Sequence, residues 1–137
     1  AGFEIIGNPS LTSLAGLETV TTIDSRLHLQ DNPLLINLTG LSAVTSIAEL
    51  HAENNAKLAN LAGAPLLETI SFGFELEHNP ELTTLRDLAN VAILSQRMTV
   101  DGNGMLPQCE VEQLRAHMTH PPLEVIGSNG AGTCTPW

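Results

Sequence analysis

Apolar residues recur along the chain with two alternating periods. After Asn8 they occupy every third position from Leu11 to Ile23, and then every second position at Leu27 and Leu29. A spacing of three matches neither an α-helix nor a β-strand, whose periods are about 3.6 and about 2 residues, whereas alternation is typical of a half-buried strand. The same succession returns at 35–52, 58–76 and 82–100. The pattern therefore predicts repeated coils, each made of a winding segment followed by a short strand.

An asparagine marks the same point of every repeat. Its short amide side chain can hydrogen-bond backbone groups where the chain turns a corner. We therefore expect these residues to form a structural ladder at the ends of the strands, and not to act in catalysis. They are spaced 23 or 24 residues apart, at Asn8, Asn32, Asn55, Asn79 and Asn103.

The repeat defines the expected fold class. Six parallel strands are predicted at 3–6, 27–30, 50–53, 74–77, 98–101 and 123–126. Sequential parallel neighbours joined by right-handed returns are the usual topology of such coils. The sequence thus predicts a mainly β protein, a right-handed β-solenoid of repeats of 23–24 residues with one parallel sheet. Residues 1–137 form one domain, with repeats at about 3–104 and a C-terminal cap at about 105–137, and Leu94 takes the last inward position before the fifth strand.

The repeated phrase resembles a known family. It is similar to the receptor L-domain type of leucine-rich repeat, found in extracellular ligand-binding regions of growth-factor receptors and in bacterial surface proteins, and it reads Leu27-x-Leu29-x-x-Asn32-x-x-Leu35-x-x-Leu38-x-x-Leu41. The Leu after each Asn comes three residues later, rather than two as in common cytosolic leucine-rich repeats. The resemblance covers 3–130 and implies extracellular recognition rather than chemistry. It does not transfer a ligand, because fold and function separate easily in such scaffolds.

The C-terminal segment is expected to cap the solenoid, whose last coil would otherwise expose its Leu layer. Residues 107–118 start with Pro, carry acidic residues in the first turn and have one apolar side, which predicts a short helix. The only cysteines are Cys109 and Cys134, and we predict that they form a disulfide that staples this cap. Two free thiols acting as a redox pair or as metal ligands would need partners that the spacing does not supply. A disulfide indicates a secreted location: extracellular, at the cell surface or periplasmic.

Composition excludes several classes of partner. The chain carries 15 acidic against 5 basic residues, a formal net charge of −10, and only 3% aromatic residues. Nucleic acids and anionic membranes bind clustered Lys and Arg, so neither is expected as a partner. No apolar run approaches the roughly 18–20 residues of a membrane span. The sequence opens in mid-repeat at Ala1, which leaves the first coil uncapped and open to self-association.

The outward positions of the strands form the candidate binding face. Stacking at about 4.8 Å brings their side chains into two columns. The predicted ligand-binding residues are His28, Gln30, His51, Glu53, Glu75, Glu77, Thr99 and Asp101, and the last strand would place Glu124 beside Thr99 and Ile126 beside Asp101. A solvated polar face explains these residues, and a divalent-cation site at His28, His51, Glu53 and Glu77 is the weaker alternative. Crowding of Glu53, Glu77 and Asp101 should raise at least one of their pKa values.

Two classes of function are compatible with this face. The first is an extracellular recognition or adhesion module that binds a protein or a glycan. The second is a carbohydrate-active enzyme, since Glu53 and Glu77 on adjacent strands can meet the roughly 5–9.5 Å separation that glycoside hydrolysis needs. Repeats of 23–24 residues leave no long loop to form a cleft, so we expect recognition, with no catalytic residue and no cofactor. A purely structural spacer is the remaining alternative.

Overall fold

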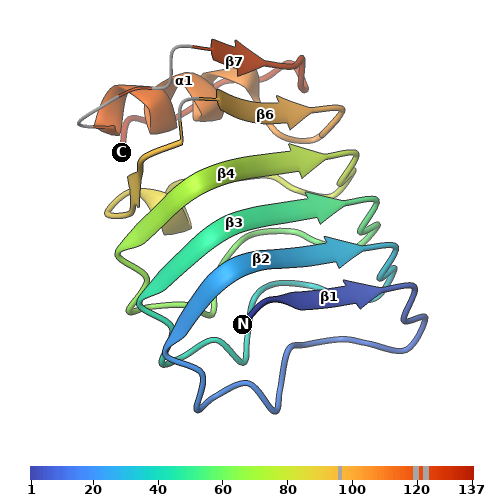
Figure 1. The fold of residues 1–137 in the computed structure, drawn as a ribbon. Coiled ribbons are helices and arrows are strands. Elements are labelled where there is room, and N and C mark those ends of the chain that lie inside the picture. Colours follow the sequence, from blue (N-terminus) through green and yellow to red (C-terminus); the bar gives the residue numbers. More distant parts are fainter. Residues whose placement is uncertain (96, 119–120, 122–123) are drawn as a thin grey trace.

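The computed structural model describes residues 1–95, 97–118, 121 and 124–137, and shows a β-solenoid with one parallel sheet and a C-terminal helix (Figure 1). Its strands are β1 (Phe3–Ile6), β2 (Thr22–Gln30), β3 (Ser46–Glu53), β4 (Thr69–Glu77), β5 (Ala92–Ile93), β6 (Arg97–Asp101) and β7 (Glu124–Ile126). They pair in parallel in the order β1-β2-β3-β4-β6-β7, and the short β5 also pairs with β4. The predicted fold class is confirmed, because each coil returns to place its strand beside the preceding one.

The winding segments explain the apolar period of three. Apolar residues donate their backbone N–H to the carbonyl three residues earlier, as in Leu41 to Leu38 (3.2 Å) and Val44 to Leu41 (3.1 Å). Such consecutive turns direct every third side chain inward, where it is buried against the equivalent side chains of neighbouring coils. Hydrogen bonds also join the coils, for example from the Leu38 N–H to the Ala62 carbonyl at 2.8 Å. The many aliphatic residues of the sequence are therefore explained by the stacked core of the solenoid.

The central strands are longer than the alternating pattern predicts. β2, β3 and β4 begin at Thr22, Ser46 and Thr69, since these residues already pair between coils before the alternation starts. The register then shifts, because 47–49 of β3 lies opposite 70–73 of β4, which has one residue more. The assignment of Leu94 to the core is wrong by one position. Ile93 pairs with Ile70 and is 1% exposed, whereas Leu94 is 50% exposed.

The asparagines form a ladder of hydrogen bonds at the carboxyl ends of the strands. The Oδ1 of Asn55 accepts from the backbone N–H of Asn32 (3.1 Å) and from its Nδ2 (3.3 Å). The Nδ2 of Asn55 donates to the Leu29 carbonyl (2.9 Å) and to Asn79 Oδ1 (3.2 Å). Asn129 continues the ladder into the last coil, where its Oδ1 accepts from Asn103. The ladder thus fixes how each strand end sits on the next, which positions the outward side chains.

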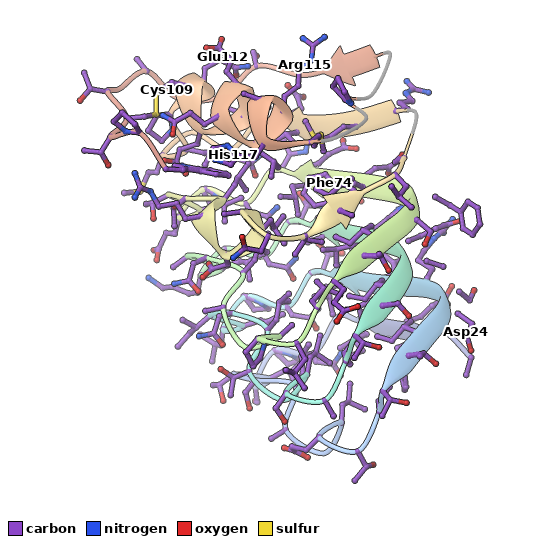
Figure 2. All side chains as sticks on the ribbon, turned by 90° about the vertical axis from the view of Figure 1, so that its left-hand side faces the viewer. Asp24, Phe74, Cys109, Glu112, Arg115 and His117 are labelled. Carbon is purple, nitrogen blue, oxygen red and sulfur yellow. A yellow bond between two sulfur atoms is a disulfide. The ribbon has the colours of Figure 1, made fainter. Side chains whose placement is uncertain are left out.

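The C-terminal cap is built from the helix α1 (Gln108–His117) and the tail that follows β7 (Figure 2). The predicted disulfide is confirmed: Cys109 and Cys134 are bonded, with their Cα atoms 6.0 Å apart. This bond is consistent with an oxidising location. Within the described residues, no helix has the length and apolar character needed to cross a membrane.

A buried carboxylate joins the cap to the coil that contains the short 3₁₀ helix η1 (Arg86–Leu88). Glu110 of α1 is buried, and its Oε2 accepts from Thr84 Oγ1 (2.8 Å) and from the Leu85 N–H (2.9 Å). Its Oε1 accepts from the indole N–H of Trp137 at 3.3 Å. The C-terminal tail is therefore held to α1 by a disulfide and by a hydrogen bond to Glu110, and the same acid ties α1 to the preceding coil.

Candidate functional site

The outward positions of the sheet form two continuous columns. The strand register places Glu4, His28, His51, Glu75 and Thr99 side by side in the first column, and Ile6, Gln30, Glu53, Glu77 and Asp101 in the second. Every residue of the candidate binding face, from His28 to Asp101, is partly exposed. Parallel pairing thus brings these side chains together on one rigid surface.

The last strand departs from the predicted register by two residues. Thr99 pairs with Ile126, and Arg97 pairs with Glu124, so the expected placement of Glu124 beside Thr99 and of Ile126 beside Asp101 is wrong. The connection before β7 is the cause, because the last step of the asparagine ladder spans 26 residues whereas the step before it spans 24. The second column therefore ends at Asp101, whose Oδ1 accepts from the Ser128 N–H at 2.8 Å.

His51 lies at the centre of the face, between two carboxylates. Its Nδ1 is 3.2 Å from Glu75 Oε2, and its Nε2 is 3.8 Å from Glu49 Oε2. The ring also meets His28 edge-on, with ring centroids 6.0 Å apart. His51 is therefore held by neighbours on three strands.

A third outward column was missed by the sequence analysis. Arg26 pairs with Glu49 across β2 and β3, and its Nε lies 2.9 Å from Glu49 Oε2. Gly73 follows in this column, and its missing side chain leaves room that Glu49 and His51 occupy. The signal was present, since Arg26 precedes His28 by two residues and alternation places both on one face.

Burial lowers the pKa of His51 below its usual range. Partial removal from water disfavours the imidazolium, and Arg26 and His28 add repulsion. Glu75 and Glu49 oppose this effect by attraction without overcoming it. The neutral imidazole is thus the favoured form at neutral pH.

The pKa of Glu77 is raised, as expected for one member of the acidic column. Burial is the largest cause, followed by repulsion from Glu75, Glu53 and Asp101, while His78 acts in the opposite direction. Like-charge crowding contributes, but desolvation contributes more. The face therefore holds a carboxylate whose charge a cation from outside would stabilise.

These two pKa shifts predict how stability depends on pH. Below about pH 7 the unfolded chain protonates His51 at its ordinary pKa near 6.5 while the folded state resists, so acidification destabilises the fold. Glu77 acts oppositely, since the folded state takes up its proton before the unfolded chain does near 4.5. As the pH is lowered from 7, the melting temperature should first fall because of His51. At lower pH, protonation of Glu77 in the folded state should then raise it.

Matched variants separate the two contributions. Melting curves of His51→Gln should lack the first fall, and those of Glu77→Gln should lack the later gain. A His51→Gln profile that still falls like the unmodified protein would show that this histidine does not control the transition.

The face offers hydrogen-bond acceptors and negative charge. In the part of the chain that the structure describes, no three His, Cys, Asp or Glu side chains converge to hold a metal ion. His51, a candidate cation ligand, faces Glu49 and Glu75 rather than Glu53. The arrangement suits recognition of a cationic or hydrogen-bond-donating surface.

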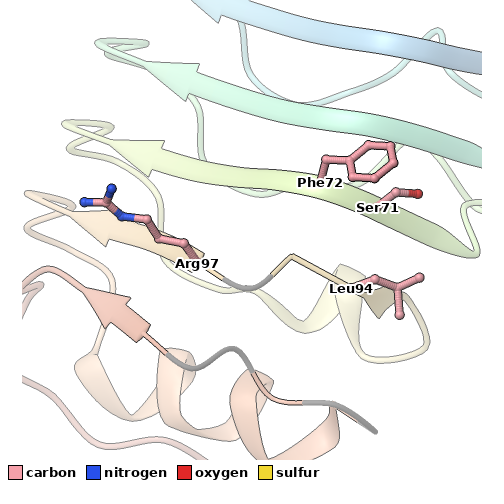
Figure 3. Close-up of a pocket in the computed structure, with 4 residues that line it drawn as sticks. All are labelled: Ser71, Phe72, Leu94 and Arg97. Atoms are coloured by element: carbon pink, nitrogen blue, oxygen red, sulfur yellow. The ribbon is translucent and has the colours of Figure 1, made fainter.

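An exposed aromatic side chain stands beside these columns and was not anticipated. Phe72 of β4 is 76% exposed and, with Ser71, Leu94 and Arg97, lines an open hollow of about 650 Å³ (Figure 3). Its exposure is not predictable from alternation, because Phe72 lies two residues before buried Phe74 and four before buried Leu76, in step with the inward positions. The irregular pairing of β3 with β4, which periodicity does not encode, places it on the outer face.

Comparison with protein-family models finds no match for this chain, and comparisons with curated proteins and with solved structures find none either.

Proposed function

We propose that this protein is a secreted recognition or adhesion module of the receptor L-domain type of leucine-rich repeat, which binds a protein or a glycan through the outward face of its parallel sheet. A module of this kind works outside the cell, at its surface or in the periplasm. The Cys109–Cys134 disulfide supports an oxidising location. The stacked coils support the comparison with leucine-rich repeats.

The observation that carries this proposal is the continuous polar face of the sheet. Strands β3 and β4 supply its centre, with His51, Glu75 and Glu77 partly exposed and in register with their neighbours. The strands that carry these side chains pack on a buried, largely aliphatic core, so the backbone beneath the face is rigid. Binding sites profit from such a rigid support, because little ordering is required when the partner arrives.

A ligand screen with matched charge variants tests the proposal. The protein is applied to a glycan array and to a phage-displayed peptide library, and the affinity of each binder is then measured. Glu53→Gln/Glu77→Gln removes two charges from the face, while Glu68→Gln/Glu112→Gln removes two exposed charges elsewhere. We expect the first pair to weaken binding about tenfold or more, and the second pair to change it little.

Three results would contradict the proposal. Equal effects of the two pairs would place recognition outside the sheet face. Turnover of a polysaccharide that stops in Glu53→Gln/Glu77→Gln would instead indicate a carbohydrate-active enzyme. Absence of any binder would favour a structural spacer.

A further inference from the structure

A hydrophobic strip crosses the sheet near the start of its long strands. Phe72 exposes most of its ring between two open hollows. One hollow, of about 650 Å³, extends toward Leu94 and Arg97. The other, of about 270 Å³, extends across β3 to Asp24 of β2. Figure 2 places Asp24 on the outer side of the sheet, so the strip lies on the same side as the polar columns.

The strip results from the shift in register between β3 and β4. The extra residue of β4 lies opposite the single residue Ala48 of β3, and Phe72 is turned out of the core. Small side chains surround it, including Ala48, Ser46 and Ser71, and leave both hollows open. A large aromatic side chain held in water on a rigid sheet loses the burial it would gain in a core, and such residues are enriched at interaction sites.

Charge surrounds this strip asymmetrically. Glu75 and Glu77 follow Phe72 along β4, at distances of about 10 Å and about 17 Å for an extended strand. Glu53 and Asp101 flank Glu77 on the neighbouring strands. Arg97 lines the hollow with its stem and directs its guanidinium away from Leu94 (Figure 3). An apolar hollow is thus continued by a row of acids in the direction of the strands.

We propose that this surface binds an extended basic segment of a partner protein, which seats an apolar or aromatic side chain against Phe72 and Leu94 and places Lys or Arg side chains on Glu75 and Glu77. The assignment rests on the proposed function and adds to it the partner class and its orientation. The anchor and the basic residues would be separated by four and six positions, because alternate side chains of an extended peptide point to the same face and these offsets span about 13 Å and about 20 Å, within reach of long Lys and Arg side chains. Guanidinium and ammonium groups would neutralise the crowded carboxylates.

Charge favours this occupant over a second copy of the chain. The protein carries a net charge of −10, so two copies repel each other, whereas a basic segment is attracted. The hollow is also lined on one side by Leu94 and Phe72, which suit an apolar side chain better than a sugar, most of whose carbons carry a hydroxyl group.

Three labelled heptapeptides test the proposal by fluorescence anisotropy at low salt. The probe has Trp at its first position and Lys at its fifth and seventh, with Gly or Ser between, so that all three side chains can face the sheet. The second peptide replaces both Lys by Glu, and the third replaces Trp by Ala. We expect the probe to bind, the Glu peptide not to bind, and the Ala peptide to bind about tenfold more weakly or worse.

Variants of the protein locate the site. Phe72→Ala should lower the affinity for the probe about tenfold or more. The control Leu66→Ala removes another exposed apolar side chain (55% exposed) and should change the affinity by less than about twofold. Phe72 lies at the surface, so unchanged melting temperatures are expected for both variants. Sedimentation of the unmodified protein should show a monomer.

Each other outcome overturns the proposal in a distinguishable way. Equal binding by the unmodified protein and Phe72→Ala, or no binding of the Lys probe, rejects the basic segment. If Glu53→Gln/Glu77→Gln still weakens the binders found on the glycan array or in the peptide library, the proposed function stands although the basic-segment proposal is rejected. If the protein is a dimer that Phe72→Ala dissociates, the strip is a self-association surface. If Phe72→Ala abolishes binding of a glycan while the peptides do not bind, the strip is a carbohydrate-binding surface.

Discussion

Gly40→Ala should destabilise the protein by several kcal/mol, far more than the equivalent change at Gly16. Both glycines occupy the same point of successive coils and have positive φ, at 120° and 108°. A Cβ on Gly40 would lie 2.1 Å from the Leu14 carbonyl oxygen, while a Cβ on Gly16 would meet nothing within 4 Å. Both changes cost about 1–3 kcal/mol of backbone strain, and Gly40→Ala must also push two coils apart.

Urea denaturation of the two variants measures the difference directly. We expect Gly40→Ala to lose at least about 2 kcal/mol more of its free energy of unfolding than Gly16→Ala. Gly63→Ala should resemble Gly40→Ala, because its Cβ would lie 2.3 Å from the Thr39 nitrogen. Equal losses at Gly16 and Gly40 would mean that the coils do not approach as closely as the structure shows.

The repeat made most of the fold predictable from sequence. Side chains at equivalent positions stack on one another, so the inward Leu positions and the starts of β1 and β6 could be predicted to within a residue. The early halves of β2, β3 and β4 were missed, because their pairing is set by contacts between coils rather than by alternation. Leu94 was misplaced for the same reason, since the register passes through Ile93.

The candidate site was predictable only where the register is regular. His28 and His51 pair as the 23-residue spacing implies, and Glu53 pairs with Glu77. Phe72 could not be placed, because a one-residue irregularity between strands decides whether its side chain turns inward or outward. The same limit applies to β7. The regular repeat predicts that Glu124 pairs with Thr99, but the longer connection makes it pair with Arg97.

Asn55→Ala should cost about 3–5 kcal/mol, while Asn8→Ala should cost less than about 1 kcal/mol. Removal of the Asn55 amide takes the Oδ1 acceptor from the backbone N–H of Asn32, leaves Asn32 Nδ2 with the Ile5 carbonyl alone, and takes the amide donor from the Leu29 carbonyl. These groups are buried, so water cannot replace the lost partners. Asn8 is exposed at the first coil, where water can satisfy the groups that it leaves.

Chemical denaturation at one pH measures both free energies of unfolding. The comparison of the two losses in free energy of unfolding is more informative than either loss alone, since both variants remove the same amide from the same repeat position. A similar loss at Asn8 and Asn55 would mean that the ladder contributes through local turns alone. A large loss confined to Asn55 would mean that buried hydrogen bonds between coils hold the strand ends in register. In that case the ladder also keeps Glu53 beside Glu77, and the binding face depends on it.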